Sequence, residues 1–190
     1  MTMTTTHSRP AVVSPRVPES TLARYPAATR APQPHTAAEL DRLIRMLRAS
    51  RAETIAIGHG RHTASAGAAD ALAAAWAVGA GQVLAVVDWP AVAASWLRPA
   101  QRLADSQPDA WILADTPAGC AQLASRLTGQ PGWTPGRTFG FASMATPDLL
   151  ALTSPGALAG MTGATAAGGS WRIGQGLLLV NDDPEGATRA

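Results

Sequence analysis

The 190-residue chain has the length of a single domain, and its lone cysteine excludes an intramolecular disulfide and a zinc site built on Cys-x-x-Cys pairs. All 15 positive charges are arginines, but residues 37–190 carry eleven of them against twelve acidic residues, so the folded part is nearly neutral. This balance argues against a nucleic-acid-binding face. No apolar stretch is long enough to span a bilayer and no signal peptide is evident, so we expect a cytoplasmic protein without a membrane span.

The first 36 residues hold six of the 15 prolines and have no helical or strand periodicity, so we expect residues 1–36 to form a disordered arm. Thr36 and Glu39 then form a capping-box pattern in front of an amphipathic helix over about 37–50. We therefore expect one α/β domain over residues 37–183, followed by a disordered end at 184–190.

Short apolar runs alternate with helical patterns through the rest of the chain. Strands are expected over about 54–57, 83–87, 111–114 and 138–142, and helices over about 65–79, 91–106 and 147–153. A further helix is defined by the apolar spacing of Cys120, Leu123, Ala124 and Leu127. A terminal hairpin is expected over about 171–180, whereas residues 155–170 have no clear pattern. Apolar strands separated by helices are typical of a parallel sheet covered on both faces. The predicted fold is a three-layer, flavodoxin-like open sheet of four or five parallel strands with a C-terminal hairpin.

Ligands bind to such sheets beyond the carboxyl ends of the strands. Four loops lie at these ends, and they hold the candidate ligand-binding residues: His59, Gly60, Arg61, His62 and Thr63; Asp88 and Trp89; Asp115 and Thr116; Ser143 and Met144. Thr116-Pro117 and Thr146-Pro147 are also typical helix starts. Their N–H groups either serve only in capping or also attract a carboxylate or phosphate, and the sequence leaves both interpretations open.

The loop from His59 to His62 has the most varied chemistry, since its two imidazoles and one guanidinium can bind an anion. A histidine pair without a nearby cysteine or carboxylate ligand is a weak metal signal, so no metal site is predicted. Cys120 is expected to be a buried apolar residue and not a nucleophile. The absence of lysine excludes a Walker P-loop, and no GxGxxG motif follows the first strand, so no cofactor is expected.

The order of elements from Ala37 to about Thr165 resembles one lobe, most closely the second, of the type I periplasmic binding proteins of branched-chain amino acid and amide ABC transporters. The resemblance is carried by Glu53-Thr-Ile-Ala-Ile-Gly58, Gly79-Ala-Gly-Gln-Val83, Pro108-Asp-Ala-Trp-Ile-Leu-Ala-Asp115, Thr146-Pro-Asp-Leu-Leu-Ala-Leu152 and Ala159-Gly160. It implies ligand contacts from the loops after the first, third and fourth strands, which here are His59 to Thr63, Thr116, and Ser143 to Met144.

The resemblance further implies a non-catalytic module that binds an amino acid or amide-like ligand in half of a cleft. The other lobe has no counterpart in this sequence, so we expect a homodimer or a partner protein to supply it. One alternative is an enzyme, because Gly58-His-Gly60 also resembles the small chelatases that insert metal into tetrapyrroles, with His59 delivering the metal. A further alternative is an orphan lobe that serves as a protein-interaction or regulatory module.

Overall fold

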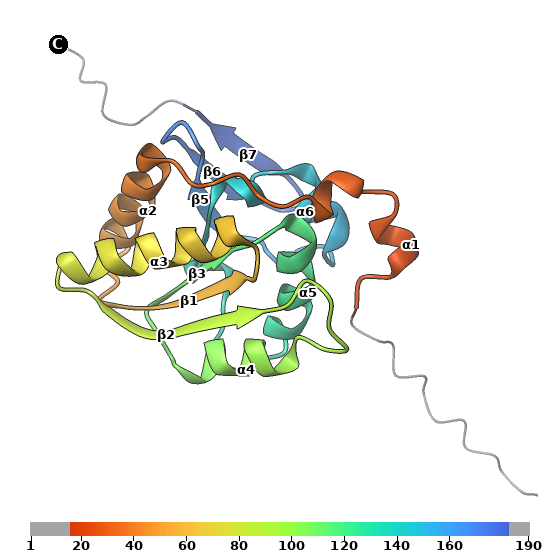
Figure 1. The fold of residues 1–190 in the computed structure, drawn as a ribbon, viewed down its shortest axis with the longest axis horizontal. Helices are drawn as coiled ribbons and strands as arrows, with labels where there is room; N and C mark the ends of the chain where they lie inside the picture. The colour runs from red at the N-terminus through yellow and green to blue at the C-terminus, as the bar shows by residue number, and fades with distance from the viewer. Residues whose placement is uncertain (1–15, 183–190) are drawn as a thin grey trace, which may run out of the picture.

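The computed structural model describes residues 16–182, which form an α/β domain around a mostly parallel sheet of seven strands (Figure 1). The strands lie in the order β2-β1-β3-β4-β5-β6-β7. Their bounds are β1 Thr54–Gly60, β2 Gln82–Trp89, β3 Ala110–Ala114, β4 Thr138–Gly140, β5 Thr162–Ala164, β6 Ser170–Ile173 and β7 Leu178–Asn181. The first five strands pair in parallel, and β6 and β7 add an antiparallel hairpin, which confirms the predicted fold class.

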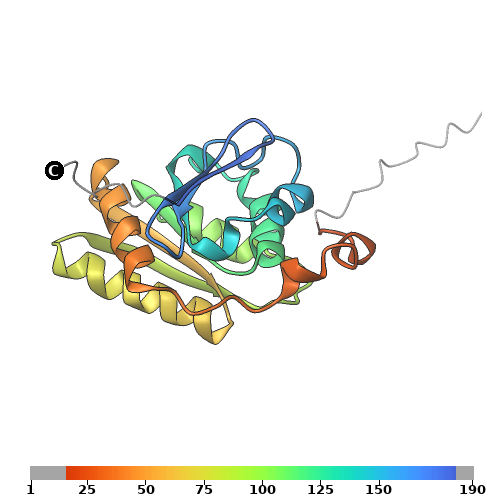
Figure 2. The same cartoon turned by 90° about the horizontal axis from the view of Figure 1, so that it is seen from above.

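Helices cover both faces of the sheet (Figures 1 and 2). Their bounds are α1 Glu19–Leu22, α2 Ala37–Ala49, α3 Thr63–Val78, α4 Leu97–Asp105, α5 Pro117–Leu127 and α6 Pro147–Leu152, with short 3₁₀ turns η1 Pro26–Thr29, η2 Pro135–Arg137 and η3 Ala142–Met144. Side chains of β1 alternate between two cores, because Ile55 and Ile57 pack with α2 and α3 whereas Ala56 packs with α4 and α5. Because β1 to β5 pair in parallel, their carboxyl ends lie at one edge of the sheet, between the two helical layers.

The helix expected over 91–106 begins later, since α4 starts at Leu97. Pro99 explains the difference. In the middle of a helix this proline would remove a hydrogen bond to the carbonyl four residues back, whereas in the first turn its missing N–H removes none. Val92, which lies within the helix expected over 91–106, is 80% exposed in the loop before α4.

The N-terminal segment differs most from expectation. Residues 1–15 and 183–190 lie outside the described residues, but residues 16–36, expected to be disordered, contain α1 and η1 and end in an extended stretch that leads into α2. Ala28 is fully buried against the α5 and α6 layer, and the backbone N–H of Val17 donates to Oε1 of Gln122 at 3.0 Å. Tertiary burial thus orders a stretch whose sequence has no periodicity of its own.

The predicted capping box is present at the start of α2. The Thr36 hydroxyl accepts the Glu39 N–H at 3.0 Å, and the Glu39 carboxylate accepts the Thr36 N–H at 3.3 Å.

In residues 16–182, no helix is both long and apolar enough to cross a membrane.

Candidate functional site

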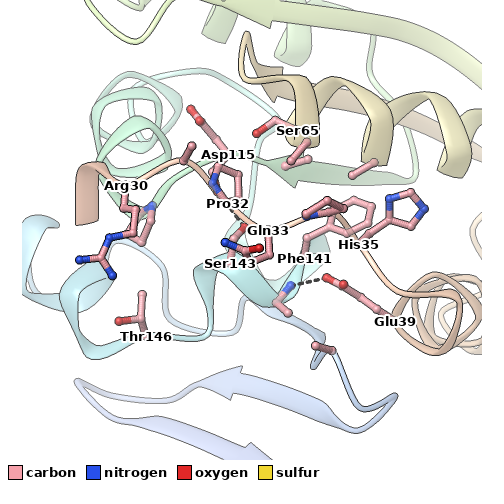
Figure 3. Close-up of a pocket in the computed structure, with 18 of the residues that line it drawn as sticks. Arg30, Pro32, Gln33, His35, Glu39, Ser65, Asp115, Phe141, Ser143 and Thr146 are labelled. Atoms are coloured by element: carbon pink, nitrogen blue, oxygen red, sulfur yellow. Dashed lines mark hydrogen bonds between the residues drawn. The ribbon is translucent and has the colours of Figure 1, made fainter. Parts of the chain in front are cut away.

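A cavity of about 420 Å³ lies at the carboxyl edge of the sheet, where ligands of such folds bind (Figure 3). Its floor, as we use the term, consists of Ser65, Asp115, Phe141 and Ser143. Its outer wall is the covering segment, defined as residues 27–35, which includes Arg30, Pro32, Gln33 and His35. The volume falls within the range of small-molecule sites, about 300–1,000 Å³.

Asp115 is the central polar group of the floor, and it follows β3 directly. The residue is 2% exposed. Oδ2 accepts the Trp89 indole N–H at 2.6 Å and Oδ1 accepts the Thr116 N–H at 2.7 Å. Burial raises the pKa of this carboxyl, and the two hydrogen bonds and the nearby His62 and His59 oppose that rise.

Two glycines make room for this carboxylate. A Cβ added to Gly60 would lie 2.1 Å from Oδ1 of Asp115, and one added to Gly119 would lie 1.8 Å from Oδ2. Neither position can take a side chain while Asp115 keeps its place. The buried carboxylate therefore requires glycine at both positions, one in β1 and one in α5.

Two serine hydroxyls complete the polar floor. The Ser143 hydroxyl donates to the backbone oxygen of Asp115 at 2.8 Å, which ties the loop after β4 to the end of β3. Ser65, in the first turn of α3, is 2% exposed, and its Oγ has no hydrogen-bond partner among residues 16–182. A buried hydroxyl without a partner costs free energy, so Ser65 is suited to bind a polar atom of a ligand in the cavity.

Glu39 lines the same cavity from α2 and is 3% exposed. Besides its capping bond, its Oε1 accepts the Ala142 N–H at 2.5 Å. Burial raises the pKa of Glu39, against the effect of these backbone hydrogen bonds and of His35. The capping box marked Glu39 in the sequence, but no sequence signal placed it beside the loop after β4.

The remaining candidate residues lie outside this cavity. His62 and Thr63 line a neighbouring hollow that shares Pro32 and His35 with the cavity. Thr116 caps α5 by accepting the Gly119 N–H at 3.0 Å. Trp89 and Met144 are fully buried in the core.

His59, Arg61 and Asp88 also do not line this cavity. The Arg61 Nε–H donates to Oδ2 of Asp88 at 2.5 Å, and this bond holds the pKa of the exposed Asp88 carboxyl below its usual range. The ring Nδ1 of His59, on which the chelatase alternative rests, lies 2.9 Å from the backbone oxygen of Gly60. Across residues 16–182, no group of three or more His, Cys, Asp and Glu side chains is placed to hold a metal ion.

Cys120 lies in α5 as a fully buried residue of the core. Burial is the main cause of a strong upward shift of its thiol pKa, and the nearby Asp115 adds to that shift. The thiolate is therefore disfavoured, as expected for a residue that serves in packing.

The fold is that of one lobe of known binding proteins, as comparison with solved structures shows. A substrate-binding periplasmic protein from Ralstonia solanacearum matches with a TM-score of 0.61 at 18% identity, over 71% of this chain and 38% of that protein. An extracellular ligand-binding receptor from Rhodopseudomonas palustris matches with a TM-score of 0.60 at 14% identity, over 70% and 36%. A protein assigned to branched-chain amino acid ABC transport from Rhodospirillum rubrum matches with a TM-score of 0.58 at 17% identity, over 67% and 36%.

The chain thus spans little more than a third of the length of these proteins, which confirms the predicted likeness to a single lobe. No protein-family model matches the sequence, and no curated protein matches it significantly. At these identities the likeness is one of fold. Two of the three proteins are named as periplasmic or extracellular, so the comparisons give no support to the expected cytoplasmic location.

Proposed function

We propose that this protein is a non-catalytic binding module for a small molecule with an amine or amide nitrogen, an amino acid or an amino acid amide. The observation that carries the proposal is the cavity at the carboxyl edge. Its floor combines the buried Asp115 carboxylate with the Ser65 hydroxyl, which has no partner within the described residues. The fold's position among substrate-binding and ligand-binding proteins supports the same function.

The charges around the cavity favour a ligand that brings a cation or N–H donors. Glu39, Asp115 and Asp148 line it, and Arg30 is the one arginine among the described residues of its lining. At the start of α5, the N–H groups of Thr116 and Gly119 are not free for an external anion, because the Asp115 carboxylate and the Thr116 hydroxyl already accept them. This occupancy favours the capping interpretation of the Thr-Pro helix start over the anion-binding one.

A matched set of three ligands tests the proposal: L-leucine, L-leucinamide and 4-methylpentanoate. They share one side chain, but the first has an amine and a carboxylate, the second has an amine and an amide, and the third has only the carboxylate. We expect L-leucine and L-leucinamide to raise the melting temperature of the full chain with increasing concentration, and 4-methylpentanoate to have no effect.

The variant Asp115→Asn separates specific binding from general stabilisation. It should bind L-leucinamide at least about tenfold more weakly, because the ammonium loses its charged partner. Arg126→Ala, a change on the far part of α5, serves as the control and should bind as the wild type does. Equal binding of all three ligands, or unchanged binding in Asp115→Asn, would contradict the proposed ligand class.

A further inference from the structure

The covering segment, residues 27–35, lies where a second wall of the site is needed. In a two-lobed protein the other lobe closes the cleft, and no second lobe is present in the described chain. Here Arg30 to His35 line the cavity opposite Ser65 and Asp115 (Figure 3). The chain therefore provides both sides of the cavity by itself.

Both ends of the covering segment are fixed to the domain. At its start, η1 packs on α5 and α6, with Ala28 fully buried. Just beyond its end, the Thr36 hydroxyl donates to the backbone oxygen of Ala166 at 2.7 Å. The His35 ring also meets the Phe141 ring edge to face, with 6.3 Å between their centroids. These contacts hold the segment across the carboxyl edge of the sheet.

Between the two anchors the segment meets the floor through the His35 and Phe141 rings, without a hydrogen bond to it within the described residues. Residues 31–35 form no hydrogen bond with any other part of residues 16–182. Pro32 and Pro34 lack N–H groups and restrict the backbone to an extended form, so the stretch stays straight without such bonds. A segment that served only in packing would fill the space below it, but a cavity of about 420 Å³ remains there.

The polar groups of this wall complement those of the floor. The floor offers the Asp115 carboxylate, which attracts an ammonium or amide N–H. The covering segment offers the Arg30 guanidinium and the Gln33 amide, which donate hydrogen bonds to a carboxylate or carbonyl oxygen. A compact molecule with an amine at one end and a carbonyl or carboxylate at the other has groups for both walls.

From these observations we infer that the covering segment takes the place of a second lobe, so that a single chain forms a complete binding site. Arg30 and Gln33 bind the carbonyl or carboxylate end of the ligand whose nitrogen faces Asp115. The inference rests on the proposed function, and it replaces the earlier expectation that a homodimer or a partner protein supplies the missing wall.

The test compares two double variants of the full chain by calorimetric titration with L-leucine and L-leucinamide. Arg30→Ala/Gln33→Ala removes the polar groups of the covering segment, and Arg24→Ala/Gln101→Ala removes the same residue types at exposed positions outside the cavity. All four side chains are exposed, so both variants should keep the wild-type melting temperature without ligand. Native mass spectrometry of the wild type gives the number of chains in the ligand-bound species.

We expect the first variant to bind L-leucine at least about tenfold more weakly, since charge-assisted hydrogen bonds to the carboxylate are lost. Its loss for L-leucinamide should be smaller, because an amide oxygen has no full charge, and the control should stay within about twofold of the wild type for both probes. The ligand-bound species should be the monomer.

Binding that is equal in wild type and both variants would overturn the inference and leave the proposed function standing. Ligand found only on dimers would also overturn it. If neither probe binds the wild type, the proposed function fails first, and the inference fails with it.

Discussion

At the scale of single residues, the site depends on how closely the chain surrounds Asp115. The carboxylate is held by Trp89 and Thr116 on one side and confined by Gly60 and Gly119 on the other. Its position at a strand end made Asp115 a candidate from the sequence alone, because parallel strands present their carboxyl ends at one edge. Ser65 could not be found in this way, since a serine one turn into a helix becomes notable only once its burial is known.

Two glycine-to-alanine changes in helices should have opposite effects on stability. Gly67→Ala, in α3, places its Cβ in open space and should stabilise the protein by about 0.5–1 kcal/mol through helix propensity. Gly119→Ala places its Cβ 1.8 Å from Oδ2 of Asp115, which the Trp89 hydrogen bond holds in place, and should destabilise it by about 1–3 kcal/mol. Urea unfolding measures both, and a stabilising Gly119→Ala would show that the carboxylate is free to move.

The raised pKa of Asp115 gives the wild type a pH dependence that Asp115→Asn lacks. Because the folded-state pKa lies above the unfolded value of about 3.9, the contribution of this group to stability is full at lower pH. It is lost as the pH rises through the folded-state value. The free energy of unfolding of the wild type, relative to that of Asp115→Asn, should therefore fall as the pH rises above the unfolded value.

Urea unfolding of both proteins at several pH values measures this difference. Glu39, whose pKa is also raised, is present in both proteins and cancels in the comparison. A difference that stays constant, or that grows with pH, would mean that burial does not dominate the environment of Asp115.

At the scale of elements, Thr36 connects α2 to the C-terminal part of the sheet. Its hydroxyl accepts the Glu39 N–H at 3.0 Å and donates to the Ala166 oxygen. Thr36→Ala should destabilise the protein by about 1–2 kcal/mol through the lost cap, whereas Thr36→Ser keeps the hydroxyl and should cost much less. Thermal unfolding of the two variants separates the hydrogen bonds of the Thr36 hydroxyl from the packing of its methyl group. Equal losses of stability in Thr36→Ala and Thr36→Ser would assign the effect to the methyl group.

Hydrophobic periodicity and the capping residues at helix starts were enough to predict most helices and strands. The Thr36 capping box and the Thr-Pro pairs before α5 and α6 fix the starts of three helices through local hydrogen bonds. The strand β5, Thr162–Ala164, was missed because its short Gly- and Ala-containing sequence has little strand preference. It forms because β4 and β6 provide partners on either side.

At the scale of the whole molecule, the sequence could not show that the N-terminal segment belongs to the domain. Proline-rich composition without periodicity is typical of disorder, and the contacts that order this segment lie about 100 residues away, as between Val17 and Gln122. For the same reason, the sequence did not show that the covering segment forms a wall of the cavity. A site whose floor comes from strand ends is visible in a sequence, whereas a wall fixed by distant contacts is not.

Tyr25, the single tyrosine of the chain, lies in this segment and packs against the α5 and α6 core, whereas all six tryptophans lie in residues 76–171. A fluorotyrosine label observed by ¹⁹F NMR therefore reports on the segment, and tryptophan fluorescence reports on the sheet and its helices. Since Ala28 is fully buried and both ends of the segment are hydrogen-bonded to the domain, we expect both signals to change at the same urea concentration.

The variant Ala28→Asp tests the origin of this cooperativity, because it places a charge in the buried contact of η1. The tyrosine signal of this variant should become that of an unfolded segment at low urea, while the tryptophan transition remains at a lower midpoint. Thr29→Asp, an exposed neighbour in the same turn, should leave the two signals coincident. A tyrosine transition that precedes the tryptophan transition in the wild type would show that the segment is only loosely attached, and a loosely attached segment could not form a fixed wall of a binding site.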